Sequence, residues 1–375
     1  MGNYEREIAI GSILASSVSF DTRPSISITT HGVIQDKGYT LYKISGKDTD
    51  GDFEVHRRYK DFSYLRIWLV KYWPGCYVPQ IPGKCRIGNM DKRNVEKRRK
   101  LLDVFVNKLT ILKHLYNSNP FQCFIRNPNS YETVSKEFQE RSYEDIASGF
   151  IQAFNELGCL NISQKDEEKV SKNLRYFNYA LASFQAFESI CNENVEEFYN
   201  FEESMEDLMG SIKEVNDFYS EFYDSKGYEI KLRNQFTNPY MILLDWSRAE
   251  VLDLQAIIEA IEGRNVIMKK YRKVNEKYDN EVKNLDLVKS GKKKGLNFNL
   301  KGENEQKDLV DKLENEVKAM EVVYRMSTLQ LLHKDFPVFK QYKVHKHEVI
   351  LRTFSSASVE EFQELVSQIV RLEEF

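Results

Sequence analysis

Basic side chains gather in three short clusters within residues 53–99, and a proline loop lies between them. The first cluster, residues 57–60, reads Arg-Arg-Tyr-Lys. The second is Lys84, which closes the loop Pro-Gln-Ile-Pro-Gly-Lys, and the third is the Lys-Arg-Arg run at 97–99. Arginine offers a planar fork that matches a phosphate, lysine a point charge, and tyrosine a flat apolar face for a ring. The clusters therefore predict a site for a compact, highly charged anion.

The elements that must position these clusters follow from the hydropathy pattern. Alternation of apolar and polar residues predicts three strands joined by two hairpin turns, and amphipathic stretches then predict helices that cover the sheet. The result is an α+β unit of about 130 residues, a usual domain size. Strands are expected at 25–35, 38–45 and 53–59, and helices at 62–73, 92–113 and 120–126.

Three motifs follow one another through this stretch at plausible spacing. The first reads Arg57-Arg58-Tyr59-Lys60-Asp61-Phe62, the second is the proline loop at 79–84, and the third runs from Arg98 to Phe105 as Arg-Arg-Lys-Leu-Leu-Asp-Val-Phe. They resemble the R-R-[FY]-x-[DE]-F motif, the proline loop ending in lysine, and the R-x-x-x-L-[ED]-x-F helix of the PX (phox homology) domain family.

That resemblance implies a ligand, phosphatidylinositol 3-phosphate, and a role for each binding residue. Arg58 would bind the 3-phosphate, and Tyr59 would lie under the inositol ring. Lys84 would meet the 1-phosphate near the bilayer, and Arg98 would hold the ring hydroxyls.

Each of these residues also has a plainer interpretation. Arg58 could be a surface arginine in a salt bridge with Asp61 or Glu96. Tyr59 could be a core tyrosine and Lys84 a solvated loop lysine.

The character of the sequence changes near residue 163. Apolar residues then recur at three- and four-residue steps over spans far longer than the usual ~11–12 residues of a helix, which predicts coiled-coil packing. The Ser-rich stretch 353–358 is expected to interrupt the last span. The predicted long helices cover 170–223, 240–289 and 306–375, and a shorter helix is predicted at 131–158, with an amphipathic stripe at its end.

Three very long helices after a PX-like domain resemble the BAR domain of sorting nexins. Residues 308–321 are also similar to the sequence motif K-L-x-x-x-E-x-x-x-A-E of that family. The stretch 143–158 stands where PX–BAR proteins carry a linking helix. The expected fold class is thus an α+β PX domain, with a three-stranded antiparallel sheet plus helices, followed by an all-α BAR domain. The expected bounds are a leader at 1–23, the PX domain at 24–128, an amphipathic linker at 129–162 and the BAR domain at 163–375.

Two further regions are candidates for membrane contact. The loop at 85–90 offers two apolar side chains for shallow insertion. The Gly- and Lys-rich stretch at 289–302 combines cations with apolar residues, which suits an anionic lipid surface, although it could equally be a solubilising loop. The basic run from Arg264 to Lys277 could line a concave lipid-facing surface or be an ordinary solvated helix face. The candidate contact residues are Ile87, Met90, Lys292, Lys293, Lys294, Leu296 and Phe298.

Composition restricts the partners. The formal net charge is only −3, and the first long helix is acidic, so nucleic acid is not expected. The five cysteines are scattered with no Cys-x-x-Cys pair, which predicts a reducing compartment. No secretory signal, membrane span, metal-ligand histidine pair or catalytic motif is evident, so we expect a peripheral membrane protein without enzymatic activity or cofactor.

The long apolar seam of the helical half predicts a dimer, either of two copies or with a different chain. The expected function is to bind phosphatidylinositol 3-phosphate on the cytoplasmic side of endosomal membrane and to sense or induce curvature there. The alternative is a structural subunit of a larger membrane assembly, with an idle lipid pocket, on another organelle such as the mitochondrion.

Overall fold

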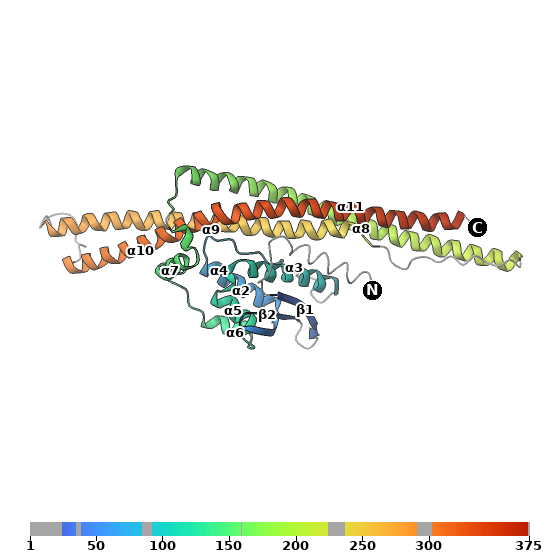
Figure 1. The fold of residues 1–375 in the computed structure, drawn as a ribbon, viewed down its shortest axis with the longest axis horizontal. Helices are drawn as coiled ribbons and strands as arrows, with labels where there is room; N and C mark the ends of the chain where they lie inside the picture. Colours follow the sequence, from blue (N-terminus) through green and yellow to red (C-terminus); the bar gives the residue numbers. More distant parts are fainter. Residues whose placement is uncertain are drawn as a thin grey trace. The chain divides into compact units, whose positions relative to one another are not determined.

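A computed structural model describes residues 25–34, 39–84, 92–158, 160–223, 237–290 and 302–373. Figure 1 labels most of its helices and strands. The chain forms two units, one comprising Met1–Asn178 with Leu252–Phe339 and the other Tyr179–Val251 with Lys340–Phe375.

The sheet consists of three antiparallel strands in sequence order, which confirms the predicted meander. A tight turn pairs Asp48 with Gly51, whose φ of 109° lies in the left-handed region that favours glycine. Along the third strand, burial alternates so that Phe53, Val55 and Arg57 face the core. The strands are β1 (Ser25–Ile34), β2 (Tyr39–Asp48) and β3 (Gly51–Arg58).

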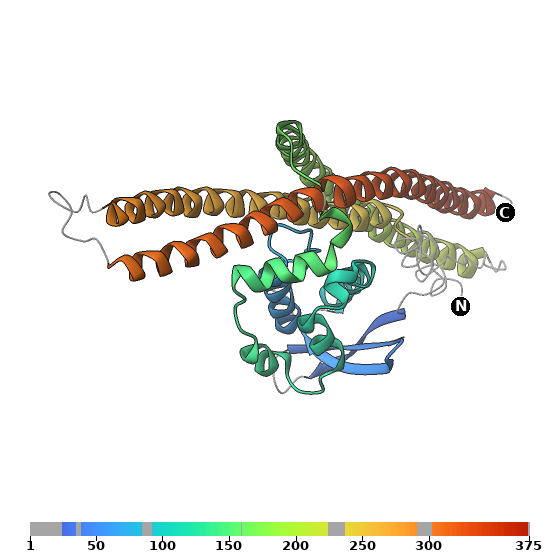
Figure 2. The ribbon, with the colours of Figure 1, turned by 60° about the vertical axis from the view of Figure 1, so that its left-hand side comes forward.

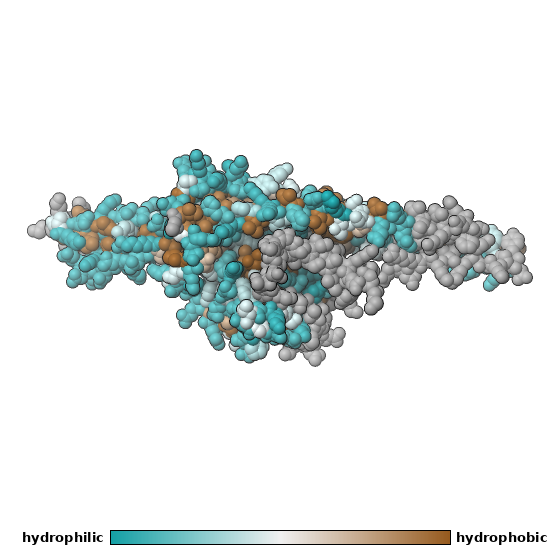
Figure 3. All heavy atoms as spheres, viewed as in Figure 1, coloured by the Kyte–Doolittle hydropathy of each residue, from teal (hydrophilic) through white to brown (hydrophobic). Residues whose placement is uncertain are grey.

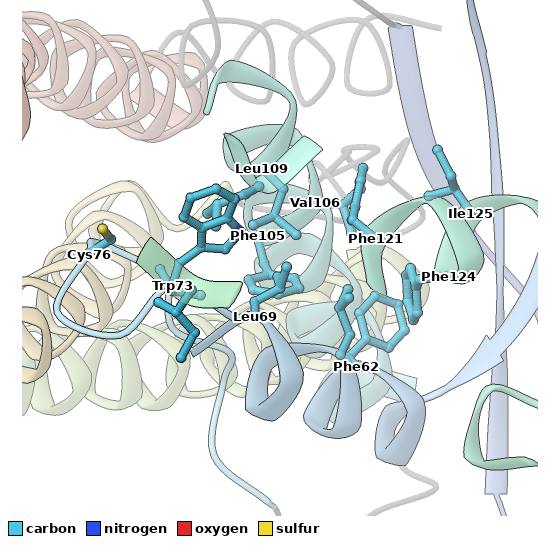
Figure 4. Close-up of a cluster of buried hydrophobic side chains, with 14 of the residues drawn as sticks. Phe62, Leu69, Trp73, Cys76, Phe105, Val106, Leu109, Phe121, Phe124 and Ile125 are labelled. Atoms are coloured by element: carbon cyan, nitrogen blue, oxygen red, sulfur yellow. The ribbon is translucent and has the colours of Figure 1, made fainter. Parts of the chain in front are cut away.

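Short helices pack on this sheet around Phe62. Its ring lies 5.0 Å from that of Phe124, 6.0 Å from Tyr42 and 6.5 Å from Phe105, and Figure 4 shows the surrounding apolar side chains. The first helix begins three residues earlier than predicted, because the Asp61 carboxylate accepts the backbone N–H of Arg58 at 2.9 Å and caps it. The helices are α2 (Tyr59–Tyr72), α3 (Lys92–Ile111), α4 (Lys113–Tyr116), α5 (Asn119–Arg126) and α6 (Tyr131–Val134).

The single helix predicted at 131–158 is interrupted. After α6 come a 3-10 turn (Ser135–Glu137), α7 (Tyr143–Ala153) and a second 3-10 turn (Asn155–Leu157). The Ser142 side chain starts α7 by accepting the backbone N–H of Asp145 at 3.1 Å.

The predicted amphipathic stripe is present on and just after α7, with Ile146, Phe150, Phe154 and Leu157 buried, but Ile151, which the pattern assigns to it, is 53% exposed. Phe150 and Phe154 pack on Trp73, and the His114 ring lies 5.1 Å from that of Phe154. Burial lowers the pKa of His114 to about 3, so this ring is neutral at physiological pH. Figure 2 shows α7, in green, beside the orange helix α10.

Four long helices follow: α8 (Gln164–Tyr223), α9 (Tyr240–Lys289), α10 (Glu303–Gln330) and α11 (Phe336–Glu373). The last two are the predicted third span, divided by a π-helical turn (Leu331–Asp335) directly before Pro337, which lacks the N–H that a regular turn would use. The interruption predicted at 353–358 is wrong. The hydroxyls of Thr353 and Ser358 donate to carbonyls four residues earlier, so these residues remain within α11.

In the first unit, the loop after α2 lies directly against α9. Gly75 approaches the backbone of Arg264, and Arg66 forms an ion pair with Glu259 at 2.6 Å. The apolar core is continuous there, since Trp73 and Leu69 belong to the same buried cluster as several residues of α9 and α10. These are Ile267, Ala319, Val323, Met326 and Leu329.

Candidate anion-binding site

Arg57 and Arg58 are neighbours with opposite environments, because successive side chains of a strand point to opposite faces. Arg57 is only 1% exposed. Its guanidinium donates to the carbonyls of Phe124 at 2.9 Å and Asn129 at 3.1 Å, and also to that of Asn127. Burial lowers the pKa of Arg57 from its ordinary value. Arg57 therefore links β3 to the chain segment around residues 124–129 and is not available to a ligand.

Arg58 stands at the junction of β3 and α2 with its side chain 29% exposed. Its guanidinium lies 5.7 Å from the centre of the Tyr39 ring and forms an ion pair with Glu132. Asp61 is farther away, with 3.8 Å between Nε and the carboxylate. The other partner considered from sequence, Glu96, is paired with Arg99 on its own helix at 2.6 Å.

The structure brings the side chains of Tyr59 and Arg98 together, and Tyr59 directly follows Arg58 in the chain. The Arg98 guanidinium lies 5.1 Å from the centre of the half-buried Tyr59 ring, and Arg98 is only 5% exposed. The Tyr59 hydroxyl donates to the Pro82 carbonyl. That hydrogen bond fixes the proline loop near the start of α2. Lys84, exposed, ends the described part of this loop.

Glu132 is the residue of this region that the sequence did not indicate. Besides Arg58, its carboxylate binds the Lys60 ammonium at 2.9 Å and accepts the Tyr64 hydroxyl at 3.3 Å. The hydrogen bond from Lys60 lowers the pKa of Glu132, so the carboxylate is charged at neutral pH. Glu132 belongs to none of the three motifs, and a lone glutamate after a loop gives no signal by which it could be found.

The remaining membrane-contact candidates have different outcomes. Arg264, the first residue of the basic run, is 1% exposed, and its guanidinium binds Glu167, Thr328 and Tyr324, so neither interpretation of the run, lipid contact or a solvated helix face, holds for this residue. In the described part of the chain, no helix is long and apolar enough to span a membrane. Seven candidates lie outside the described residues: Ile87, Met90, Lys292, Lys293, Lys294, Leu296 and Phe298.

Comparison with known proteins gives a family for the first domain and relatives for the chain. The PX domain model matches residues 46–128. Sorting nexin-4 of Eremothecium gossypii is 22% identical over 388 residues, which cover 90% of this chain and 92% of the relative. Vps5, a vacuolar protein sorting-associated protein of Schizosaccharomyces pombe, is 28% identical and sorting nexin mvp1 of the same yeast is 30% identical, over 35% and 36% of this chain. The matches span only 26% and 21% of these two relatives.

The fold also has a counterpart among solved structures. The cryo-EM structure of the SNX-BAR Mvp1 tetramer superposes with a TM-score of 0.53 at 15% identity, covering 92% of this chain and 99% of the other. This likeness concerns the fold: a PX domain followed by an all-α BAR domain. Together with the PX match and the sorting nexin relatives, it shows that residues 46–128 form a PX domain and that the chain is similar in sequence and fold to the PX–BAR sorting nexins.

Proposed function

We propose that this protein binds phosphatidylinositol 3-phosphate through its PX domain and senses or induces membrane curvature through a dimeric BAR domain, acting in endosomal sorting. The relatives named as sorting nexins support the pathway and a peripheral location on endosomal membrane. The observation that carries the lipid proposal is the contact of Arg98 with Tyr59, the residue after Arg58, together with the hydrogen bond that links Tyr59 to the proline loop.

The chemistry of these side chains suits an inositol phosphate. The Arg58 guanidinium can hold two oxygens of a phosphate at once, and the Tyr59 ring offers an apolar face to the inositol ring. Arg98, which lies beside that ring and is 5% exposed, would donate to inositol hydroxyls, and the exposed Lys84 on the proline loop would meet a second phosphate. The proposed activity is binding, with no chemical step.

Replacing Arg58 by alanine is expected to weaken binding to vesicles that contain phosphatidylinositol 3-phosphate by about 10- to 100-fold, the value of one charged, bidentate contact. Sedimentation with wild-type and variant protein measures this. Arg99→Ala is the matched control, because Arg99 is paired with Glu96 and should change binding by less than about 2-fold.

Equal binding by wild type and Arg58→Ala would contradict the lipid proposal. It would instead favour the alternative, a structural subunit of a membrane assembly with an idle pocket. The ion pair that already engages Arg58 is the observation on which that alternative draws.

The dimer proposal is supported by an apolar stripe on α8. Phe201, Leu208, Val215 and Phe222 repeat every seven residues and are 42%, 52%, 55% and 70% exposed. A seven-residue repeat keeps side chains on one side of a helix, as in a coiled-coil seam. Figure 3 shows that hydrophobic residues also interrupt the hydrophilic surface of other long helices. We propose that a second copy of the chain covers this stripe.

Light scattering coupled to gel filtration should give twice the mass of one chain for the wild type and the mass of one chain for the double variant Leu208→Glu with Val215→Glu. Two buried charges without partners would destabilise the seam. The control is Gly210→Glu, which adds the same charge to an exposed position on the opposite side of α8, with no atoms within 4 Å of the new Cβ. A single-chain mass for the wild type, or a double variant that stays dimeric, would refute pairing through this stripe.

A further inference from the structure

The Glu132 carboxylate lies against the guanidinium of Arg58, the residue proposed above to bind a phosphate. It forms ion pairs with both Arg58 and Lys60, and it accepts a hydrogen bond from Tyr64. The two cations and the hydroxyl all come from the start of α2 or the residue directly before it. A carboxylate with two cationic partners and one hydroxyl partner reproduces much of what a phosphate would accept there.

The main chain fixes Glu132 in this place. Arg57 binds the carbonyls of Asn127 and Asn129, which determines the path of the chain leading to α6. The preceding residue, Tyr131, is fully buried, and its hydroxyl donates to the Pro120 carbonyl at 3.0 Å. Because these contacts hold the backbone next to Glu132, its side chain faces Arg58. Glu132 lies four residues beyond the stretch that matches the PX domain model, so this contact comes from outside the motifs.

The contact with Glu132 can nevertheless be exchanged. The Arg58 and Glu132 side chains are each 29% exposed, so neither charge is sealed from water. Asp61 differs, because it accepts the backbone N–H of Arg58 and is buried at the helix start. A phosphomonoester carries about −1.5 to −2 charges at pH 7 against the single charge of a carboxylate, so it can displace Glu132 from Arg58.

We propose that Glu132 is an internal competitor that occupies the phosphate position at Arg58 and sets the affinity of the pocket. The proposal rests on the proposed function, since it concerns the same site. A ligand binds only the fraction of molecules in which Arg58 is released, and its apparent affinity falls by that fraction. A pocket weakened in this way holds a membrane firmly only when the BAR domain contributes a second attachment.

The experiment measures binding of the full-length chain to two probes: inositol 1,3-bisphosphate in solution, and vesicles of phosphatidylcholine with phosphatidylinositol 3-phosphate. Glu132→Gln removes the charge and keeps the shape, and it should bind both probes about 5- to 10-fold more tightly than the wild type. Inorganic phosphate, added as a competitor, tests whether the free anion alone can occupy the site.

Two variants serve as controls. Glu140 is paired with Lys71, another lysine of α2, and among the described residues it has no arginine partner, so Glu140→Gln removes an equivalent charge without releasing Arg58. It should leave binding of the soluble probe unchanged. In an Arg58→Ala background, the gain from Glu132→Gln should fall below about 2-fold, because the cation it releases is gone.

The outcomes separate this inference from the proposed function. Unchanged or weaker binding by Glu132→Gln overturns the inference and makes Glu132 a residue that orients Arg58. A gain of equal size in Glu140→Gln, or one that persists without Arg58, overturns it as well, because it reflects general charge. An Arg58→Ala variant that binds like the wild type refutes the proposed function itself, and that comparison uses only proteins that retain Glu132.

Discussion

Replacing Arg57 by alanine should destabilise the protein by about 3–5 kcal/mol, as expected when a buried charged donor is removed and its partners remain. The loss follows from the number of acceptors: the carbonyls of Phe124, Asn127, Asn129 and His56 all depend on this guanidinium. Urea unfolding followed by circular dichroism measures the change in the free energy of unfolding.

The adjacent arginine is the natural control for that measurement. Arg58→Ala removes a partly exposed ion pair and leaves the capping backbone N–H in place, so it should cost less than about 1 kcal/mol. The two variants should thus have opposite phenotypes, one losing stability and the other losing lipid binding. Similar losses of stability in both would contradict the structural role assigned to Arg57.

Replacing Gly75 by alanine should cost about 2–4 kcal/mol, because two penalties act together. Gly75 has a φ of 76°, which alanine adopts only with strain. An added Cβ would also lie 3.1 Å from the Cα of Arg264, so the loop would have to move away from α9. The same urea unfolding experiment measures this effect.

Gly51→Ala separates the two penalties. Gly51 has a φ of 109° but no atom within 4 Å of an added Cβ, so only the conformational cost applies there, about 1–2 kcal/mol. If Gly75→Ala were no more destabilising than Gly51→Ala, the close approach between the loop and α9 would not contribute to stability.

Periodicity in the sequence predicts most of the elements, because strand and helix repeats depend on residues close together in the chain. The errors arise where a single side chain overrides the pattern. Asp61 starts α2 early, and Ser142 starts a new helix within a segment that looks continuous. Thr353 and Ser358 keep α11 intact by bonding within the helix, although their composition suggests a break.

Part of the arrangement at the candidate site also follows from local sequence patterns. Tyr59 and Arg98 belong to two different motifs, and the structure places their side chains together. Glu132 lies 74 residues from Arg58 in sequence, and its position depends on which carbonyls Arg57 binds. No local pattern encodes that choice, so only the three-dimensional structure reveals the carboxylate at the pocket.

The buried cluster that joins Trp73 to Val323 and Met326 has a consequence for synthesis on the ribosome. Helix α10 ends at Gln330, 177 residues after α7 ends at Ala153. At about 5–20 residues per second, roughly 10–35 s pass before the last part of this cluster is made. During that interval the PX domain presents an apolar surface that α10 does not yet cover. We therefore expect the nascent chain to bind ribosome-associated chaperones. A fragment ending at residue 128 would keep this surface exposed permanently.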